Sequence, residues 1–306
     1  MDRTIVLDML RKYSTIVVWR LYSPNTSTHR HIHRHVYSVL KKLDCKVFWC
    51  DDLVENNALV PDGSLVISAE QCCKHIQYNK SNWYAMAHTV AHIENCRNYL
   101  HMRAYGDSYI GPNEVNWNET TVFNKSWHIL SQTFVTDLLP EEFLCPIYKG
   151  NAKVINWVGS IWQDKNGHGN LDNIAKLKAS LQKRGLVFTN YQNVSDEENI
   201  YYVRESRIAP AIGGTAQIAS MLPCRIWKNI SYGQLGITNL HKASEVFGDS
   251  VVYADDIDQL MDMALSVEEK RYKEKTLYQQ KLVADRYTYL NWLYFIMRAL
   301  EELGVQ

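Results

Sequence analysis

Short apolar runs of strand length alternate with amphipathic stretches of helix length along this chain, and this alternation restricts the fold more than any other feature. The β-branched run 14–21 predicts a buried strand, and apolar residues at helical spacing predict a helix from about 28 to 43. Further strands are predicted at 46–50, 64–68 and 84–90. Strands that alternate with helices are typical of a parallel sheet with helices on its faces.

A second alternating series starts after Pro146. Its predicted strands are 153–158, 185–189, 236–238 and 250–254, with an apolar run at 207–211, and its predicted helices are 170–184, 197–205, 215–222, 225–232, 242–247 and 257–265, followed by one or two helices at the end of the chain. A length of 306 residues suits two domains. The sequence therefore predicts an α/β protein in which two Rossmann-like domains, residues 1–145 and 146–306, face a central cleft.

The composition argues against several classes of function. The 33 Lys and Arg residues balance 33 Asp and Glu residues, so the chain lacks the positive field that sequence-independent nucleic-acid binding needs. No window reaches the roughly 18 uncharged apolar residues of a membrane span, and residues 1–12 lack the apolar core of a signal peptide. Seven cysteines without a CxxC spacing indicate reduced thiols. We therefore expect a cytoplasmic protein that binds no nucleic acid.

Glycine-rich turns follow the predicted strands of the second half, at the positions where open α/β sheets bind ligands. Gly159 and Ser160 follow one strand, and Gly213 and Gly214 follow the run 207–211. Such turns let backbone N–H groups approach a phosphate closely, although they are also common as plain turns and helix caps. No GxGxxG, GxxxxGK[ST] or GxSxG pattern is present, so the dinucleotide, P-loop and hydrolase classes lose their usual support.

The segment 222–239 (LPCRIWKNISYGQLGITN) is the most informative part of the chain. Arg225 and Lys228 are three residues apart and share one face of the predicted helix. Two cations on a mostly apolar helix suit a diphosphate, although a solvated helix face has a similar pattern. The predicted diphosphate site comprises Gly159, Ser160, Arg225, Lys228, Ser231, Tyr232, Gly233, Gln234, Thr238 and Asn239.

The same segment resembles a block in the donor-nucleotide domain of GT-B glycosyltransferases, especially the CgeB-like and exostosin-like branches. That block has the form P-x-R-[ILV]-[FW]-E-x-[ILMV]-x-x-G, and the matching residues are Pro223, Arg225, Ile226, Trp227, Lys228, Ile230 and Gly233. Lys228 stands where these enzymes commonly have the glutamate that holds the donor ribose. The segments 44–52, 136–142 and 156–162 also resemble sugar transferases encoded by large algal DNA viruses.

This resemblance implies a GT-B fold and a glycosyltransferase. The enzyme would move one hexose or pentose from a nucleotide diphosphate sugar, UDP- or GDP-linked, to a hydroxyl of a glycan or glycoprotein. Inversion at the anomeric carbon is expected because the exostosin-like branch inverts. Two alternatives remain: a non-catalytic sugar- or nucleotide-binding module of the same fold, and a two-domain protein that closes around a small anion.

Inversion requires a group that takes the proton of the acceptor, and we expect this group in the first half of the chain. His29 starts the first long helix, a position that resembles that of the catalytic His in many plant-type GT-B enzymes, and an imidazole with a pKa of about 6.5 suits the task. Asp51 and Asp52 end the second strand and could act as the base or orient it, while His88 ends the fourth. The alternative for each is an ordinary capping or surface residue.

No metal site is predicted. Pairs among the four histidines of 29–35 have ligand spacing on a helix, but no third ligand is evident. The adjacent pairs Asp51-Asp52 and Asp255-Asp256 are not the DxD of metal-dependent transferases. We therefore expect a metal-independent reaction without a cofactor, in which cations and backbone groups hold the leaving diphosphate of the nucleotide sugar.

Overall fold

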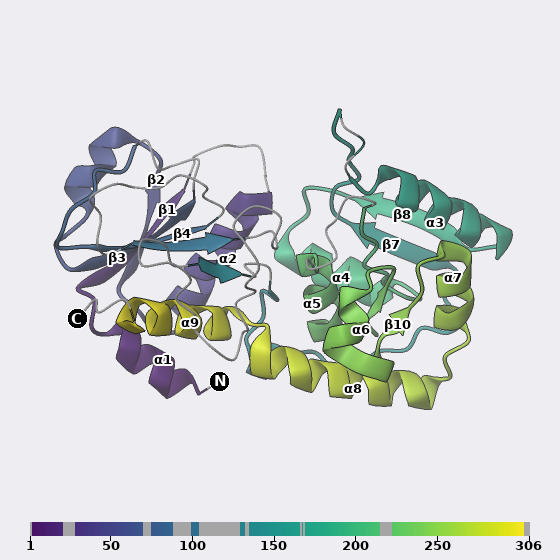
Figure 1. Ribbon diagram of the computed structural model, residues 1–306. Helices are drawn as coiled ribbons and strands as arrows, with labels where there is room; N and C mark the ends of the chain where they lie inside the picture. Colours follow the sequence, from purple (N-terminus) through teal and green to yellow (C-terminus); the bar gives the residue numbers. More distant parts are fainter. Residues whose placement is uncertain are drawn as a thin grey trace. The chain divides into compact units, whose positions relative to one another are not determined.

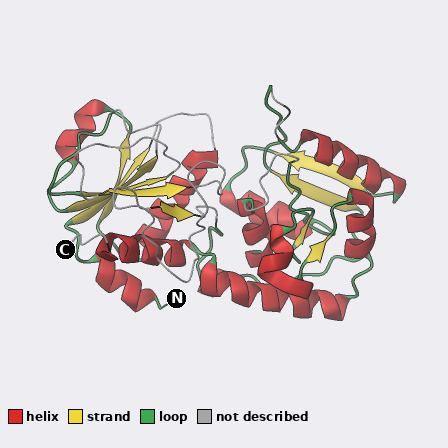
Figure 2. Cartoon of the chain, viewed as in Figure 1, coloured by secondary structure: helices red, strands yellow, loops and turns green. Residues whose placement is uncertain are grey.

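The computed structural model describes residues 2–20, 28–69, 75–87, 99–103, 129–131, 135–165, 167, 169–214 and 222–302. The chain forms two compact units (Figure 1). Unit 1 comprises Met1–Asp137 together with Thr288–Gln306, and unit 2 comprises Leu138–Tyr287. Each unit contains parallel strands with helices packed around them (Figure 2). The predicted domains, 1–145 and 146–306, differ from these units at the boundary and in the assignment of the last helix.

Unit 1 is built on a six-stranded sheet in the order β2-β1-β3-β4-β5-β6, whose strand pairs are parallel. The strands are β1 (Thr15–Arg20), β2 (Val47–Asp51), β3 (Ser64–Ala69), β4 (Trp83–Ala87), β5 (Tyr99–Arg103) and β6 (Ile129–Ser131). The helical elements are α1 (Arg3–Leu10), α2 (Thr28–Lys42), the 3-10 helix η1 (Val54–Leu59) and α9 (Tyr289–Glu302). Helix α2 packs against β1 and β2, and α9 packs against α1, α2, β5 and β6.

The predicted strand 14–21 is confirmed as β1, which lies between β2 and β3 and is buried along its whole length. Side chains alternate between the two faces of a strand, so Val17 and Trp19 share one face. On that face they form a core cluster with Val66 of β3 and Tyr84 of β4. The predicted helix 28–43 is confirmed as α2, which packs against β1 and β2.

Unit 2 contains two pairs of parallel strands, β7 with β8 and β9 with β10. The strands are β7 (Val154–Val158), β8 (Val187–Tyr191), β9 (Ile237–Thr238) and β10 (Val252–Tyr253). The helices are η3 (Pro140–Glu142), α3 (Leu171–Lys183), α4 (Asp196–Glu205), α5 (Cys224–Ser231), α6 (Lys242–Phe247), η4 (Gly248–Ser250), α7 (Ile257–Leu265) and α8 (Glu269–Arg286). Most of these elements lie within two residues of their predicted positions; the predicted helix 215–222 lies almost entirely outside the described residues.

The extended segment 207–213 connects the two strand pairs of unit 2. The N–H of Arg207 donates to the carbonyl of Val154 in β7 at 2.9 Å, and the N–H of Ala211 donates to the carbonyl of Ile237 in β9 at 2.8 Å. Pro210 has no N–H, so the segment cannot form a continuous ladder of hydrogen bonds. The apolar run 207–211 therefore lies between β7 and β9, and their carboxyl ends meet at one edge.

The end of the chain forms two helices that belong to different units. Helix α8 ends at Arg286 in unit 2, and α9 begins at Tyr289 after Thr288, whose hydroxyl accepts the N–H of Asn291 at 3.4 Å. Helix α9 packs on the sheet of unit 1. Both C-terminal helices were predicted to belong to the second domain, whereas α9 belongs to unit 1 in the structure. The apolar face of a helix shows that the helix is packed on a core, but it does not show on which core.

Across the part of the chain that the structure describes, none of the helices combines the length and the apolar character that crossing a membrane requires.

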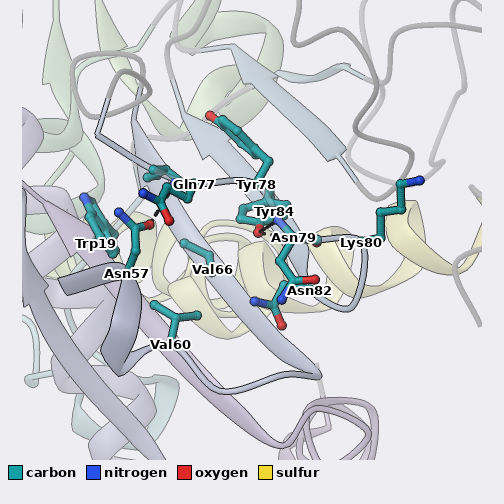
Figure 3. A pocket seen from close by; sticks show the side chains of 11 residues that line it. Trp19, Asn57, Val60, Val66, Gln77, Tyr78, Asn79, Lys80, Asn82 and Tyr84 are labelled. Carbon is teal, nitrogen blue, oxygen red and sulfur yellow. Dashed lines mark hydrogen bonds between the residues drawn. The ribbon is translucent and has the colours of Figure 1, made fainter. Parts of the chain in front are cut away.

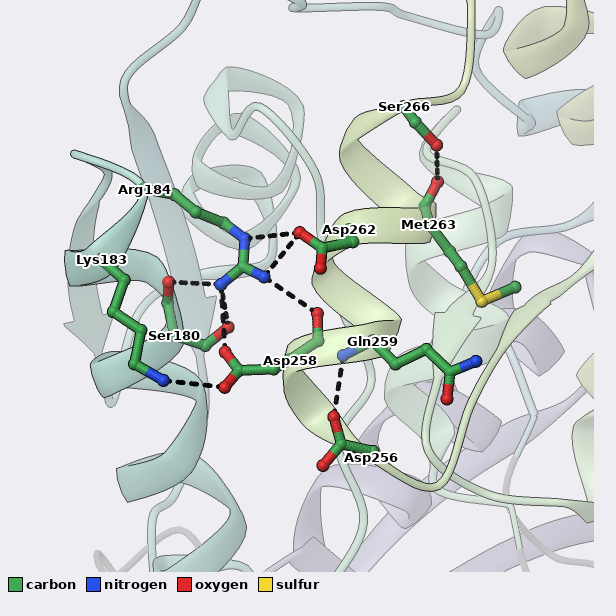
Figure 4. Close-up of polar contacts among 9 residues, drawn as sticks. All are labelled: Ser180, Lys183, Arg184, Asp256, Asp258, Gln259, Asp262, Met263 and Ser266. Carbon is green, nitrogen blue, oxygen red and sulfur yellow. Dashed lines mark hydrogen bonds and ion pairs between the residues drawn. The ribbon is translucent and has the colours of Figure 1, made fainter.

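An ion-pair cluster joins α3 to α7 on the surface of unit 2 (Figure 4). Arg184 donates from Nε and Nη2 to Asp262 at 3.0 and 2.6 Å, and from Nη1 to Asp258 at 3.0 Å. Lys183 reaches the other oxygen of Asp258 at 2.8 Å. Hydrogen bonds from Lys183, Ser180 and Arg184 hold the pKa of Asp258 well below its usual range. A carboxyl group whose pKa is lower in the folded protein than in the unfolded chain stabilises the fold at pH values above its unfolded pKa. This stabilisation is lost as the pH falls towards and through the pKa of the folded protein.

We expect Arg184→Ala to lower the melting temperature near neutral pH and to have progressively less effect as the pH falls into the acid range. The measurement is thermal unfolding of Arg184→Ala, Asp258→Ala and the double variant at several pH values. The losses should be less than additive, because both variants break the same contact. Lys176→Ala, which removes another exposed cation of α3, is the control. Fully additive losses at neutral pH would show that the two residues do not cooperate.

Candidate functional site

The carboxyl ends of β7, the segment 207–213 and β9 meet at one edge of unit 2, where open α/β sheets bind ligands. We call Gly159, Ser160, Gly169, Gly213 and Gly214 the glycine edge. Hydrogen bonds with asparagine side chains connect the segments of the glycine edge. The amide of Asn170 donates to the carbonyl of Ser160 at 3.2 Å, that of Asn173 donates to Gly213 at 2.8 Å, and Asn239 accepts the N–H of Gly213 at 2.8 Å.

Backbone segments approach one another at this edge too closely for any side chain. A Cβ atom on Gly214 would overlap the carbonyl oxygen of Gly169, and a Cβ on Gly169 would overlap the carbonyl of Trp162. Gly169 also has a φ of +138°. At Gly159, where φ is +122°, a Cβ would lie 2.5 Å from Nη2 of Arg225. The glycines therefore bring three chain segments and one guanidinium to the same place, a stronger role than an ordinary turn.

Arg225 lies in the first turn of α5, and β7 holds its guanidinium. Its Cζ atom lies 3.6 Å from the centre of the Trp157 ring, and Nε and Nη2 donate to the carbonyl of Val158 at 3.2 and 2.9 Å. Burial lowers the pKa of Arg225 to about 10, so the group remains a cation at neutral pH. No carboxylate among the described residues pairs with it. A partly buried cation without a counter-charge, beside backbone turns, suits an anionic ligand.

The predicted residues at the other end of α5 are part of the framework. Ser231 donates to the carbonyl of Lys228 at 2.9 Å, and Gln234 donates to Val203 and Ser206 at 2.9 and 3.0 Å. The carbonyl of Tyr232 accepts Arg204 at 2.6 Å. The carbonyl of Gly233 accepts the N–H of Ile147 at 2.9 Å.

Ser231 lies six positions after Arg225, which corresponds to about 9 Å along a helix. Ser231, Tyr232, Gly233 and Gln234 are thus apart from Arg225, and the predicted site divides in two. In the structure they hold α4 and the segment 144–147 against α5, and their role in binding the donor stays a prediction.

The remaining predicted donor residues lie nearer to the edge. Thr238 is buried and donates to the carbonyl of Ala211 at 2.7 Å, so it fixes the segment that leads to Gly213. Asn239 holds Gly213 directly. Lys228 is 6% exposed and lies one helical turn after Arg225. The sequence had not indicated Trp157 beneath Arg225, or the asparagines of α3 and its N-cap.

Unit 1 contains a separate pocket of about 400 Å³ (Figure 3). Trp19, Val66 and Tyr84 line it from the sheet. Asn57 lines it from η1 and Val60 from the residue after that helix. The other lining residues come from the segment before β4: Ile76, Gln77, Tyr78, Asn79, Lys80 and Asn82. The pocket therefore combines aromatic rings with amide groups and one ammonium group.

Asp52 follows β2, and its carboxylate is fully buried. Oδ1 accepts the indole N–H of Trp19 at 2.8 Å, and Oδ2 lies 2.8 Å from Nδ1 of His75, whose side chain is 28% exposed. A fully buried carboxylate has no direct access to a substrate hydroxyl, which favours the orienting role over the role of the base. Both roles of Asp52 stay predictions. No pattern in the sequence pointed to His75.

His29 lies in the first turn of α2, and its side chain is not among the described ones; His88 also lies outside the described residues. Asp255 accepts the hydroxyl of Tyr253 at 2.6 Å, and Asp256 caps α7 through the N–H of Gln259 at 2.8 Å. These two carboxylates are thus engaged locally. The expected independence from metal ions stays a prediction.

No protein-family model matches the sequence, and no curated protein matches it either. Solved structures match the fold. The N-terminal domain of a Candida albicans trehalose-6-phosphate phosphatase matches with a TM-score of 0.54 at 8% identity, over 95% of this chain and 97% of that one. An E. coli trehalose-6-phosphate protein bound with UDP-2-fluoro glucose gives 0.52 at 8% identity, over 95% and 99%.

A UDP-forming α,α-trehalose-phosphate synthase from Burkholderia vietnamiensis gives a TM-score of 0.51 at 9% identity, over 96% of this chain and 99% of that one. These neighbours have the GT-B fold, so the predicted GT-B class with two Rossmann-like halves is confirmed at the level of the fold. The resemblance to CgeB-like, exostosin-like and algal-virus transferases stays a prediction.

Proposed function

We propose that this chain is a glycosyltransferase that moves one sugar from a nucleotide diphosphate sugar, UDP- or GDP-linked, to a hydroxyl of a glycan or glycoprotein. The observation that carries the proposal is Arg225, a partly buried cation at the glycine edge without a carboxylate partner among the described residues. The GT-B fold supports the proposal. One of the similar structures binds UDP-2-fluoro glucose, and another belongs to a UDP-forming synthase.

In this proposal, unit 2 binds the donor. Backbone N–H groups of the glycine edge and the guanidinium of Arg225 hold the diphosphate, and a planar guanidinium can grip two phosphate oxygens at once. Lys228, one helical turn away, adds a second positive charge. These cations stabilise the charge that develops on the leaving diphosphate, so the reaction proceeds without a divalent metal ion. Trp162, which is 49% exposed in the loop after Ser160, offers a ring face to the base or sugar.

Unit 1 receives the acceptor in this proposal. Its pocket lies against the sheet that carries Asp52, and its lining includes the exposed amide of Gln77 and the half-buried ring of Tyr78. Sites of this composition suit sugar rings, which present both hydroxyls and an apolar face.

The experiment is a thermal-shift screen with UDP, GDP, CMP and dTDP sugars, followed by an assay for release of the free nucleotide, with and without excess EDTA. A ligand that binds only the folded state at a hundred times its Kd stabilises that state by about 2.7 kcal/mol, which is readily visible. We expect one nucleotide sugar to raise the melting temperature and to be consumed slowly, at the same rate in EDTA. The nucleoside without phosphates is the control.

Each result of this screen has a definite meaning. If no millimolar nucleotide sugar shifts the melting transition, the donor site is wrong. Binding without turnover, in water or with a panel of methyl glycosides as acceptors, would identify a nucleotide-sugar-binding module instead. Loss of activity in EDTA that Mg²⁺ or Mn²⁺ restores would reject the metal-independent reaction.

A further inference from the structure

Asp52 places a carboxylate in the interior of unit 1, at the edge where parallel sheets bind ligands. The residue follows the carboxyl end of β2, next to the end of β1, with Arg20 paired to Asp51 in the register. Its side chain is 0% exposed, and its described partners are the indole N–H of Trp19 and the imidazole of His75. A buried charge is costly unless it is paired, so a residue in this position requires a partner such as His75.

His75 is held in place by its backbone. The side-chain NH₂ of Asn57 donates to the carbonyl of His75 at 2.7 Å, and the side-chain oxygen of Asn57 accepts the N–H of Gln77 at 2.7 Å. The backbone of Trp19 is fixed in turn, since the hydroxyl of Ser68 donates to its carbonyl at 2.8 Å. The dyad is therefore anchored on β1, β3 and η1, the rigid support that a functional group needs.

The two nitrogens of His75 are in different surroundings. Nδ1 lies 2.8 Å from Oδ2 of Asp52, within ion-pair distance but without the alignment of a hydrogen bond. The ring remains 28% exposed, and Nε2 has no partner among the described residues. A carboxylate beside Nδ1 favours the tautomer that carries its proton there. The lone pair of Nε2 is then available to an incoming hydroxyl group.

We propose that His75 is the proton acceptor for the acceptor hydroxyl and that Asp52 is its positioning residue. This proposal rests on the proposed function, sugar transfer with inversion. Nε2 takes the proton of the acceptor hydroxyl, and the oxygen forms a bond to the anomeric carbon of the donor. The bond from that carbon to the phosphate oxygen breaks, and its electron pair leaves on the nucleoside diphosphate. Loss of the proton from imidazolium to water restores the neutral ring.

The dyad can be tested first without any substrate. Nitrogen-15 NMR of the imidazole of the wild-type protein at a pH where the ring is neutral should show the Nδ1–H tautomer of His75, assigned by comparison with His75→Gln. In Asp52→Asn this preference should be lost, whereas Asp8→Asn, which removes an exposed aspartate of unit 1, should leave it unchanged. An Nε2–H tautomer in the wild-type protein would overturn the proposal.

The second test uses the nucleotide sugar found by thermal shift, with methyl glycosides as acceptors. His75→Gln should reduce transfer at least a hundredfold and keep the donor Kd within about twofold, because the donor is bound by unit 2. Asp52→Asn should reduce kcat without raising the KM for the donor. Added imidazole should restore part of the activity of His75→Ala.

The outcomes separate this inference from the function on which it rests. Transfer by His75→Gln at near the wild-type rate would overturn the role of His75 while leaving the transferase intact. A wild-type protein that neither binds nor consumes a nucleotide sugar would instead refute the proposed function. If Asp52→Asn fails to fold, His75→Gln and His75→Ala still decide the matter, because the ring of His75 is partly exposed and belongs to none of the described core clusters.

Discussion

Arg225→Ala is expected to lower kcat/KM for the nucleotide sugar by about tenfold to a thousandfold, equivalent to about 1.4 to 4 kcal/mol of transition-state stabilisation. The guanidinium supplies a charge-assisted contact to the diphosphate, and the charge on the leaving group grows as the bond to the sugar breaks. The measurement combines steady-state kinetics with nucleotide affinity by calorimetry. Arg225→Lys should be intermediate, since it keeps the charge but loses the planar group that stacks on Trp157.

The control must account for the structural contacts of Arg225, which bonds the carbonyl of Val158. Arg204 is a matched residue in the same unit, because its guanidinium donates to the carbonyls of Cys145 and Tyr232 at 3.1 and 2.6 Å. Arg204→Ala should lower stability yet keep the nucleotide affinity of the folded protein. Equal affinity losses in both variants, or unchanged kinetics in Arg225→Ala, would make Arg225 structural.

The secondary structure could be predicted where the period of apolar residues was distinct. Helix α7 was predicted with its observed bounds, and β1 and α2 nearly so, since each carries a regular buried face. The N-terminal helix α1 was not predicted, because its eight residues hold a short apolar face between charges. The location of α9 could not be predicted, because chain order does not specify the core on which an amphipathic helix packs.

The candidate site was predicted where local chemistry was enough. Arg225 was recognised as a cation on an apolar helix, and Gly159 was recognised as a glycine that follows a strand. The structure brings the two residues into contact. Ser231 and Gln234 were included as part of the informative segment 222–239, but they lie at and beyond the end of α5, whereas Arg225 lies in its first turn. His75 was missed because its pairing with Asp52 links positions 23 residues apart through the sheet, and the sequence shows no such contact.

Gly169→Ala is expected to be among the most damaging substitutions in unit 2, although it adds one methyl group. Gly169 pairs with Gln163 in an antiparallel bridge, and its φ is +138°. A Cβ there would overlap the carbonyl of Trp162, a backbone atom that cannot rotate away. The backbone strain costs about 1 to 3 kcal/mol and the overpacking about as much again. We therefore expect the free energy of unfolding to fall by about 3 kcal/mol or more.

Gly167→Ala in the same loop is the matched control. Gly167 also has a positive φ, +81°, but a Cβ on it would meet nothing within 4 Å. It should carry the backbone strain alone, about 1 kcal/mol. Chemical denaturation of both variants measures the difference, which is the cost of the close approach itself.

The same pair of variants tests whether the glycine edge binds the donor. Gly169 precedes Asn170, whose amide holds the carbonyl of Ser160 and accepts the N–H of Trp162 at 3.0 Å. Displacing Asn170 should therefore disturb the turn that faces Arg225, and nucleotide affinity in folded Gly169→Ala should fall at least tenfold. Gly167→Ala should bind nucleotide within about twofold of the wild-type protein. If the two alanine variants show equal stability and equal affinity, the close packing of the glycine edge serves neither the fold nor the donor.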